Sequence, residues 1–302
     1  MRRFSAVAVL LLSASLGAVL AAQSAAPTTT GITLVSPGAE PRALLRYHPV
    51  AGAKNRAAMV MDMRMTMDVG GMAAPAMNMP RITSDVEMGV TAVNADGDIT
   101  FSTRSTNMKI DTTNTDPVLA AAMQGALPAT GGVAAGGVMS SRGEPRDVKL
   151  DAASMSAEAQ AFVGQFQDAM RQVQAGLPAE PVGVGAQWDV VSTVTQSGSE
   201  MIGKMRFELV AIDGDVVTLK ARGTIGAGKG GPALPGLPPG ADVDVRDMSG
   251  DVNGNMRVNL RTMETSADLK TEMRISADLK MQGQTMPFST KISMQMTLGP
   301  VK

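Results

Sequence analysis

A run of alternating methionines restricts the fold of this chain more than any other feature. Between residues 59 and 67 every odd position is methionine, and the even positions carry Val60, Asp62, Arg64 and Thr66. A period of two places alternate side chains on opposite faces of a β-strand, whereas a helix would scatter them around its axis. The run therefore predicts a strand with one apolar and one solvated face.

Several other segments predict long antiparallel strands. Asp-Gly turns at residues 94–98 and 213–215 stand between alternating apolar runs, a pattern that favours hairpins because glycine accepts positive φ. Alternating apolar residues also run through 256–260, 269–281 and 286–298, with Met294 and Met296 on the inward face of the last strand. These strands are longer than usual. They predict a strongly curved antiparallel sheet or an open barrel or sandwich.

One helix is expected in the middle of the chain, over residues 154–175. Phe162, Phe166 and Val173 recur at helical spacing with other apolar residues, and Gly176 with Pro178 ends the pattern. The only tryptophan, Trp188, follows in a predicted strand. The expected fold class is mainly β (α+β), with this one main amphipathic helix packed against the sheet.

The chain divides into a predicted signal peptide at residues 1–22, a flexible lead-in at 23–43 and a single β-rich domain at 44–302. Residues 88–98 and 205–215 both place an alternating strand before an Asp-Gly-Asp turn. This match favours two related halves, at about 44–150 and 177–302, joined by the helix. Duplication and convergence on a shared hairpin chemistry both remain open.

The first residues indicate an exported protein. Arg2 and Arg3 precede an apolar run and small residues, the layout of a secretory signal. The chain has no cysteine, which excludes disulfides, thiolate metal sites and a lipoprotein anchor. Loss of the two arginines changes the formal net charge from −1 to about −3, which gives no attraction to nucleic acid. We expect a soluble periplasmic or extracellular protein without a transmembrane segment after signal cleavage.

The candidate metal and catalytic sites are weak. Thioethers suit Cu(I), but the alternating methionines contain no histidine, and methionine is also a flexible filler of apolar cores and cavities. His48 is the only histidine, so it cannot complete a zinc site or a Cys-His pair. The two Asp-Gly-Asp turns lack the ligand pattern of a calcium loop. We therefore expect no metal, no cofactor and no enzymatic activity.

The segment that joins the helix to the tryptophan carries a resemblance. It reads Leu177-Pro178-x-x-Pro181-Val182-x-Val184-Gly185-x-x-Trp188. With the methionine-alternating strand it resembles an uncharacterised family of exported bacterial proteins, a domain of unknown function. A curved sheet with a helix is also similar in architecture to the periplasmic lipoprotein-carrier folds. The shared motifs are structural, so the resemblance implies no functional residue.

Three functions remain open. The leading hypothesis is a non-enzymatic envelope protein that binds a lipid or another apolar envelope component in a methionine-lined cavity. The alternative is a structural or protein-interaction module with a filled core, and the third is a Cu(I)-binding protein. The expected cavity-lining residues are Met61, Met63, Met65, Phe162, Phe166, Trp188, Met294 and Met296.

Overall fold

The protein is described here from a computed structural model, which covers residues 29–73, 76–115, 134–151, 176–196, 199–228, 242–281 and 284–301. These residues form fourteen β-strands in one sheet, and they contain no helix. The strands are β1 (Thr29–Ser36), β2 (Lys54–Val69), β3 (Met72–Ala73), β4 (Met77–Asn78), β5 (Arg81–Val93), β6 (Ile99–Asp111), β7 (Ala134–Met139), β8 (Pro145–Asp151), β9 (Gln187–Gln196), β10 (Ser199–Asp213), β11 (Val216–Ala227), β12 (Asp242–Asn259), β13 (Thr265–Met281) and β14 (Gln284–Pro300).

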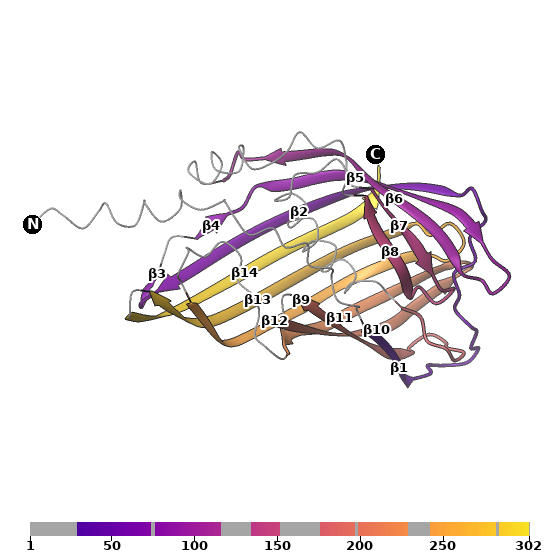
Figure 1. The fold of residues 1–302 in the computed structure, drawn as a ribbon. Coiled ribbons are helices and arrows are strands. Elements are labelled where there is room, and N and C mark those ends of the chain that lie inside the picture. The colour runs from indigo at the N-terminus through magenta and orange to yellow at the C-terminus, as the bar shows by residue number, and fades with distance from the viewer. Residues whose placement is uncertain are drawn as a thin grey trace, which may run out of the picture.

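The sheet is open and antiparallel throughout, and Figure 1 shows its strong curvature. Its strand order is β1-β9-β10-β11-β12-β13-β14-β2-β5-β6-β7-β8, with β3 and β4 paired to the distal part of β2. Most neighbours are hairpins, but the pairing of β14 with β2 joins the C-terminal strand to an N-terminal one. The short strands β1 and β8 form the two edges.

The predicted strands are confirmed where the sequence pattern was strongest. The alternating methionines lie within β2, the two Asp-Gly turns connect β5 to β6 and β10 to β11, and the C-terminal runs form β12, β13 and β14. In the turns Gly97 and Gly214 have φ values of 81° and 57°, the left-handed conformation that glycine accepts without strain. The strongly curved antiparallel sheet is therefore correct.

The α+β class is wrong, because every element of the described residues is a strand. The helix expected over 154–175, with Phe162, Phe166 and Val173, falls outside the described residues, as does the predicted signal peptide. Residues 29–36, expected within a flexible lead-in, instead form β1, which pairs with β9 from Thr29 to Ser36. Pairing to a neighbour far along the chain overrode the weak local pattern of this segment.

The core lies on one face of the sheet. Directly paired residues share a face in an antiparallel sheet, so the register traces continuous rows across the strands. One row spans eight strands: Trp188, Phe207, Ala221, Gly254, Leu269, Met296, Met61 and Ile82. Trp188 of β9 and Met59 of β2 belong to one buried cluster although five strands separate them. The sheet therefore curls around this face, which is its concave side.

One end of the curved sheet is covered by chain, and we call it the capped end. Residues 37–53 cross from β1 to β2, and residues 176–186 lead into β9. The two crossing segments bond to each other, since Ala43 and Val182 form an isolated antiparallel bridge. They place Leu45, Leu177 and Val182 in the core cluster, each at most 4% exposed. The capped end is thus a filled hydrophobic core.

Candidate ligand-binding face

The methionine stripe (Met59, Met61, Met63, Met65 and Met67) lies on the concave face. In the register, Met63 stands opposite Met294 and Met61 opposite Met296, so β2 and β14 bring four of the predicted site residues together. The charged residues Asp62 and Arg64 occupy the alternate positions and therefore project from the outer face. The period-two prediction for this strand is confirmed residue by residue.

Burial varies along the stripe. Met59 and Met61 are 4% and 6% exposed and belong to the packed region near the capped end. Further along β2 the side chains are only half-buried. We call this half-buried region the apolar window; it comprises Met63, Met65, Met273, Ile292 and Met294. In the row beyond it Met248 and Ile275 are again buried. The window therefore lies between two buried zones of the same face.

Trp188 was expected to line a cavity, and the structure places it deep in the core at the capped end. It is fully buried, its ring stacks on Phe207 with centroids 5.9 Å apart, and its Nε1–H donates to the carbonyl oxygen of Gly176 at 2.8 Å. That bond satisfies the only polar group of the indole. Trp188 therefore fixes residue 176 against the sheet, in the row next to that of Met63 but separated from β2 by five strands.

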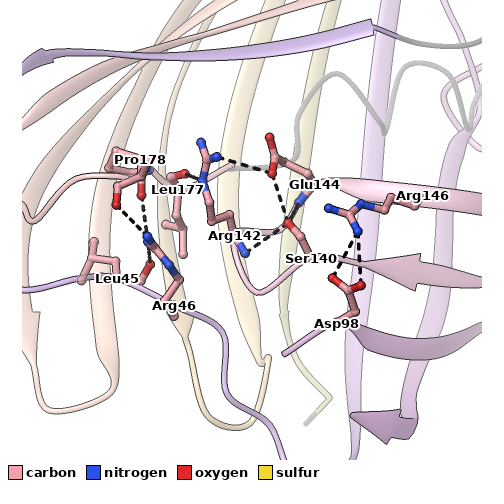
Figure 2. Close-up of polar contacts among 10 residues, drawn as sticks. Leu45, Arg46, Asp98, Ser140, Arg142, Glu144, Arg146, Leu177 and Pro178 are labelled. Atoms are coloured by element: carbon pink, nitrogen blue, oxygen red, sulfur yellow. Dashed lines mark hydrogen bonds and ion pairs between the residues drawn. The ribbon is translucent and has the colours of Figure 1, made fainter. Parts of the chain in front are cut away.

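Polar contacts join the two edges of the sheet at the capped end (Figure 2). The turn between β7 and β8 approaches the segment that leads into β9. The amide of Leu177 donates to the carbonyl oxygen of Arg142 at 2.8 Å, and Arg142 Nε donates to the carbonyl oxygen of Leu177 at 2.9 Å. Arg46 adds bonds to the carbonyl oxygens of Pro178 at 2.8 Å and Ala179 at 2.7 Å. We call Arg46, Arg142 and their carbonyl partners the edge junction.

The electrostatics of the edge junction are those of a partly buried structural contact. Partial burial lowers the pKa of Arg46, and the neighbouring charge of Arg142 lowers it further. Glu144 lies 3.7 Å from Arg142 and also accepts the hydroxyl hydrogen bond of Ser140 at 3.2 Å. Next to them, burial raises the pKa of Tyr47 to about 12. Backbone carbonyl oxygens accept hydrogen bonds from Arg46 and Arg142, and the carboxylate of Glu144 lies next to Arg142. The junction thereby holds the sheet edges together.

A groove of about 320 Å³ lies along β13, β14 and β2; most of its lining residues are polar, and Met63, Met79 and Met294 also contribute to it. Its best-defined ion pair is bidentate: Arg81 Nε and Nη2 donate to Asp62 at 2.7 and 3.1 Å. Glu272 is paired with Lys291 at 3.0 Å. Exposed pairs of this kind contribute roughly 0–1 kcal/mol each and are typical of a solvated strand surface. The concave face, in contrast, carries apolar side chains along β2 and β14.

The residues weighed as metal or catalytic candidates have other partners. His48 Nε2 lies 3.2 Å from Asp215, whose second oxygen is 4.0 Å from Arg261, and Asp98 pairs with Arg146 at 3.2 Å. Both Asp-Gly-Asp turns are therefore tied to cations of the protein. In the part of the chain that the structure describes, no three His, Asp or Glu side chains gather as a metal site. That part also contains no helix long and apolar enough to cross a membrane.

One known family matches a segment of the chain that includes strands near both edges of the sheet. Residues 138–263 match DUF6263, a family of unknown function. No curated protein matches the chain. The DUF6263 segment contains the turn before β8 and β8 itself, then β9 to β12. It therefore includes both sides of the Arg142–Leu177 contact, and it includes the segment from Leu177 to Trp188 that carried the predicted resemblance.

Two groups of residues escaped the sequence analysis. Arg46 and Arg142 had no signal, because each acts from a loop on the backbone of a segment far along the chain. Ser84 is 3% exposed on the concave face, opposite Met59, and Ser105 stands opposite Val86 on the same face. The alternation of Val86, Met88 and Val90, extended back by two residues, reaches Ser84 and would have placed it there.

Proposed function

We propose that the protein is a non-enzymatic, exported envelope protein that binds an apolar ligand, such as a lipid acyl chain, at the apolar window. The observation that carries the proposal is the half-burial of four methionines and one isoleucine on a concave face, between two buried zones. Methionine is unbranched and polarisable, so a methionine-rich surface adapts to chains of different shape.

Charge supports the same function. The acidic and basic residues of β2 and β14 lie at the alternate positions that face the outer side of the sheet, among them Asp62, Arg64 and Lys291. A concave surface lined by apolar groups is the ordinary form of a small-molecule site. Such a surface accepts a hydrocarbon chain without the cost of burying an unpaired charge.

Export and the likeness to lipoprotein-carrier folds belong to this proposal as well. The secretory layout of residues 1–22 supports a periplasmic or extracellular location, where a lipid-binding face has substrates. A single curved antiparallel sheet with an apolar concave face supports the architectural comparison.

The proposal is tested by two substitutions at neighbouring positions of β2. Met65→Lys places a charge in the apolar window, whereas Thr66→Lys places the same charge on the exposed outer face. We expect Met65→Lys to weaken binding of a fluorescent naphthylamine probe by about tenfold or more, because an unpaired charge is costly in an apolar site. Thr66→Lys should bind like the wild type. Equal affinities in the two variants would overturn the assignment.

The alternative, a structural or interaction module with a filled core, predicts a different result. Native mass spectrometry of protein purified from the envelope would then show the bare chain mass, and the naphthylamine probe would not bind the wild type. A lipid-sized mass increment supports the ligand-binding function instead. A copper-sized increment would favour the third candidate, a Cu(I)-binding protein.

A further inference from the structure

Two serine hydroxyls on the concave face have no hydrogen-bond partner. Ser84 Oγ and Ser105 Oγ are both buried atoms without a donor or acceptor in reach. Buried hydroxyls in proteins are almost always paired, and an unpaired one costs about 1–3 kcal/mol. Two unpaired buried hydroxyls on the face that we assign to a ligand therefore need a physical explanation.

The two hydroxyls, which we call the hydroxyl pair, lie close together. Ser84 stands opposite Met59, and Ser105 stands opposite Val86, which is two residues beyond Ser84 on the same strand. The register of β5 and β6 shifts at Ser84, between Thr83 and Asp85, so the two serines are neighbours on the same face of adjacent strands without regular diagonal pairing. Regular diagonal neighbours have Cα atoms about 7–8 Å apart. Both hydroxyls can then reach the two oxygens of one small group at hydrogen-bond lengths of about 2.7–2.8 Å.

Among the described residues, the side chains next to the hydroxyl pair on the concave face of β2 and β5 are apolar. Met59 and Val86 belong to or pack against the core cluster, and the neighbouring row contains Met61 and Ile82. The nearest charges on β5 are bound elsewhere: Asp85 accepts from Asn107 at 2.7 Å, and Glu87 accepts from Arg56 at 2.9 Å. An anionic group next to Ser84 would therefore be buried without a counter-charge, which is costly.

The flank of this patch is accessible. Ile82, Val86 and Ser105 are half-buried, although the hydroxyls of Ser84 and Ser105 are themselves covered. Met61, in the row between the patch and that of Met63, is buried, but its partner Ile82 on β5 is half-buried, so the patch adjoins the apolar window past Ile82. A ligand chain that lies in the window reaches the hydroxyl pair with one end along this side.

We infer that the hydroxyl pair is the polar subsite of the ligand face, and that it binds a neutral oxygen-bearing group of an acyl ester. Both serines donate to the ester oxygens while the acyl chain occupies the apolar window. This inference rests on the proposed function and specifies its ligand class: an uncharged acyl ester, in preference to a plain hydrocarbon or an ionised fatty acid.

The test compares three probes on the full-length mature protein. Methyl dodecanoate, the n-alkane with the same number of heavy atoms, and dodecanoate at pH 8 each compete with the naphthylamine probe. The variants are Ser84→Ala/Ser105→Ala and the control Ser102→Ala, whose side chain is exposed on β6. We expect the double variant to lose roughly tenfold of its affinity for the ester, the equivalent of two net hydrogen bonds. Its affinity for the alkane should not change, and Ser102→Ala should match the wild type for both.

The outcomes separate this inference from the function on which it rests. If the ester-to-alkane affinity ratio is the same in the wild type and the double variant, the subsite is wrong while the apolar ligand face stands. If ionised dodecanoate binds the wild type better than the ester does, the neutral ligand class is wrong. If no probe binds, both proposals fail. Thermal unfolding of the double variant should be at or above the wild-type midpoint, because the substitution removes two unpaired buried hydroxyls.

Discussion

Single residues set the geometry of the core where large and small side chains alternate along a row. In the row that runs from Trp188 to Ile82, Gly254 faces Leu269, and a Cβ built on Gly254 would lie 2.6 Å from Leu269 Cδ2 and 2.1 Å from the carbonyl oxygen of Asp268. Gly223 leaves the same room for the sulfur of Met205. Interiors pack at near-crystal density, so these glycines are the complement of the long side chains beside them.

Trp188 is the residue whose loss should be felt most clearly. Trp188→Phe retains an aromatic ring against Phe207 but leaves the carbonyl oxygen of Gly176 without its donor. We expect the free energy of unfolding to fall by roughly 1–3 kcal/mol, the cost of an unpaired buried group, with a contribution from the smaller ring. Denaturant unfolding followed by circular dichroism measures this change. Val191→Ala, at an exposed position of the same strand, should change the value by less than about 0.5 kcal/mol. Equal losses of stability in the two variants would contradict the structural role assigned to Trp188.

At the scale of elements, hydrophobic periodicity identified most strands but not their partners. The odd methionines of β2 could only form a strand, and the Asp-Gly turns fixed two hairpins. The alternation in β14 is compatible with several neighbours, and only the folded chain shows that Met296 meets Met61. β1 was missed because its sequence, TTGITLVS, has little apolar alternation before Ile32.

The candidate site, like the strands, could be predicted from the sequence only in part. The inward methionines followed from the period of two, and Met294 and Met296 were assigned to the correct face. Trp188 was assigned to a cavity because it is large and apolar, yet its neighbours across the sheet place it in the filled core. The hydroxyl pair depends on which strands adjoin and on what surrounds each serine, information that no local pattern contains.

The methionine stripe should tolerate another side chain of similar volume. In the variant Met61→Leu/Met63→Leu/Met65→Leu we expect the fold to be retained, with a cost below about 1.5 kcal/mol for each position. Most of that cost should come from Met61, which is 6% exposed, while the other two are half-buried. Circular dichroism and thermal unfolding check the result. Stoichiometric Cu(I) binding by the wild type that is lost in this variant would contradict an apolar role for the stripe.

At the scale of the whole molecule, no backbone hydrogen bonds between β1 and β8 close the described sheet on itself, but side-chain and loop contacts connect its two edges at the capped end. β1 and β8 have no strand partner on their outer sides among the described residues. At the capped end the edge junction connects them indirectly, through Arg142, Leu177 and Arg46. Unpaired edges invite association with other chains, and short strands reduce that risk. The six to eight residues of β1, β7 and β8 are consistent with such protection.

The contribution of the junction is measurable. Arg142→Ala removes the side-chain bond to Leu177, and we expect a loss of about 0.5–1.5 kcal/mol, with faster amide exchange at Leu177. Arg146→Ala is the matched control. Arg146 lies on the same edge, and within the described part of the chain its side chain pairs with Asp98 at an exposed position. Hydrogen exchange resolved by residue distinguishes the two variants. Identical exchange profiles would show that Arg142 does not hold the edges together.

The pairing of β14 with β2 has a consequence for how the chain is made. Residues 57–69 find their neighbours at 288–300, which leave the ribosome long after β2. Until then β2 lacks a partner on one side and β13 lacks one on the other, and both expose apolar strand faces. Contacts between such distant segments form slowly, and unpaired apolar strands aggregate readily. Synthesis of β14 completes the middle of the sheet, so a chain made only as far as β13 consists of two separate half-sheets with open apolar edges.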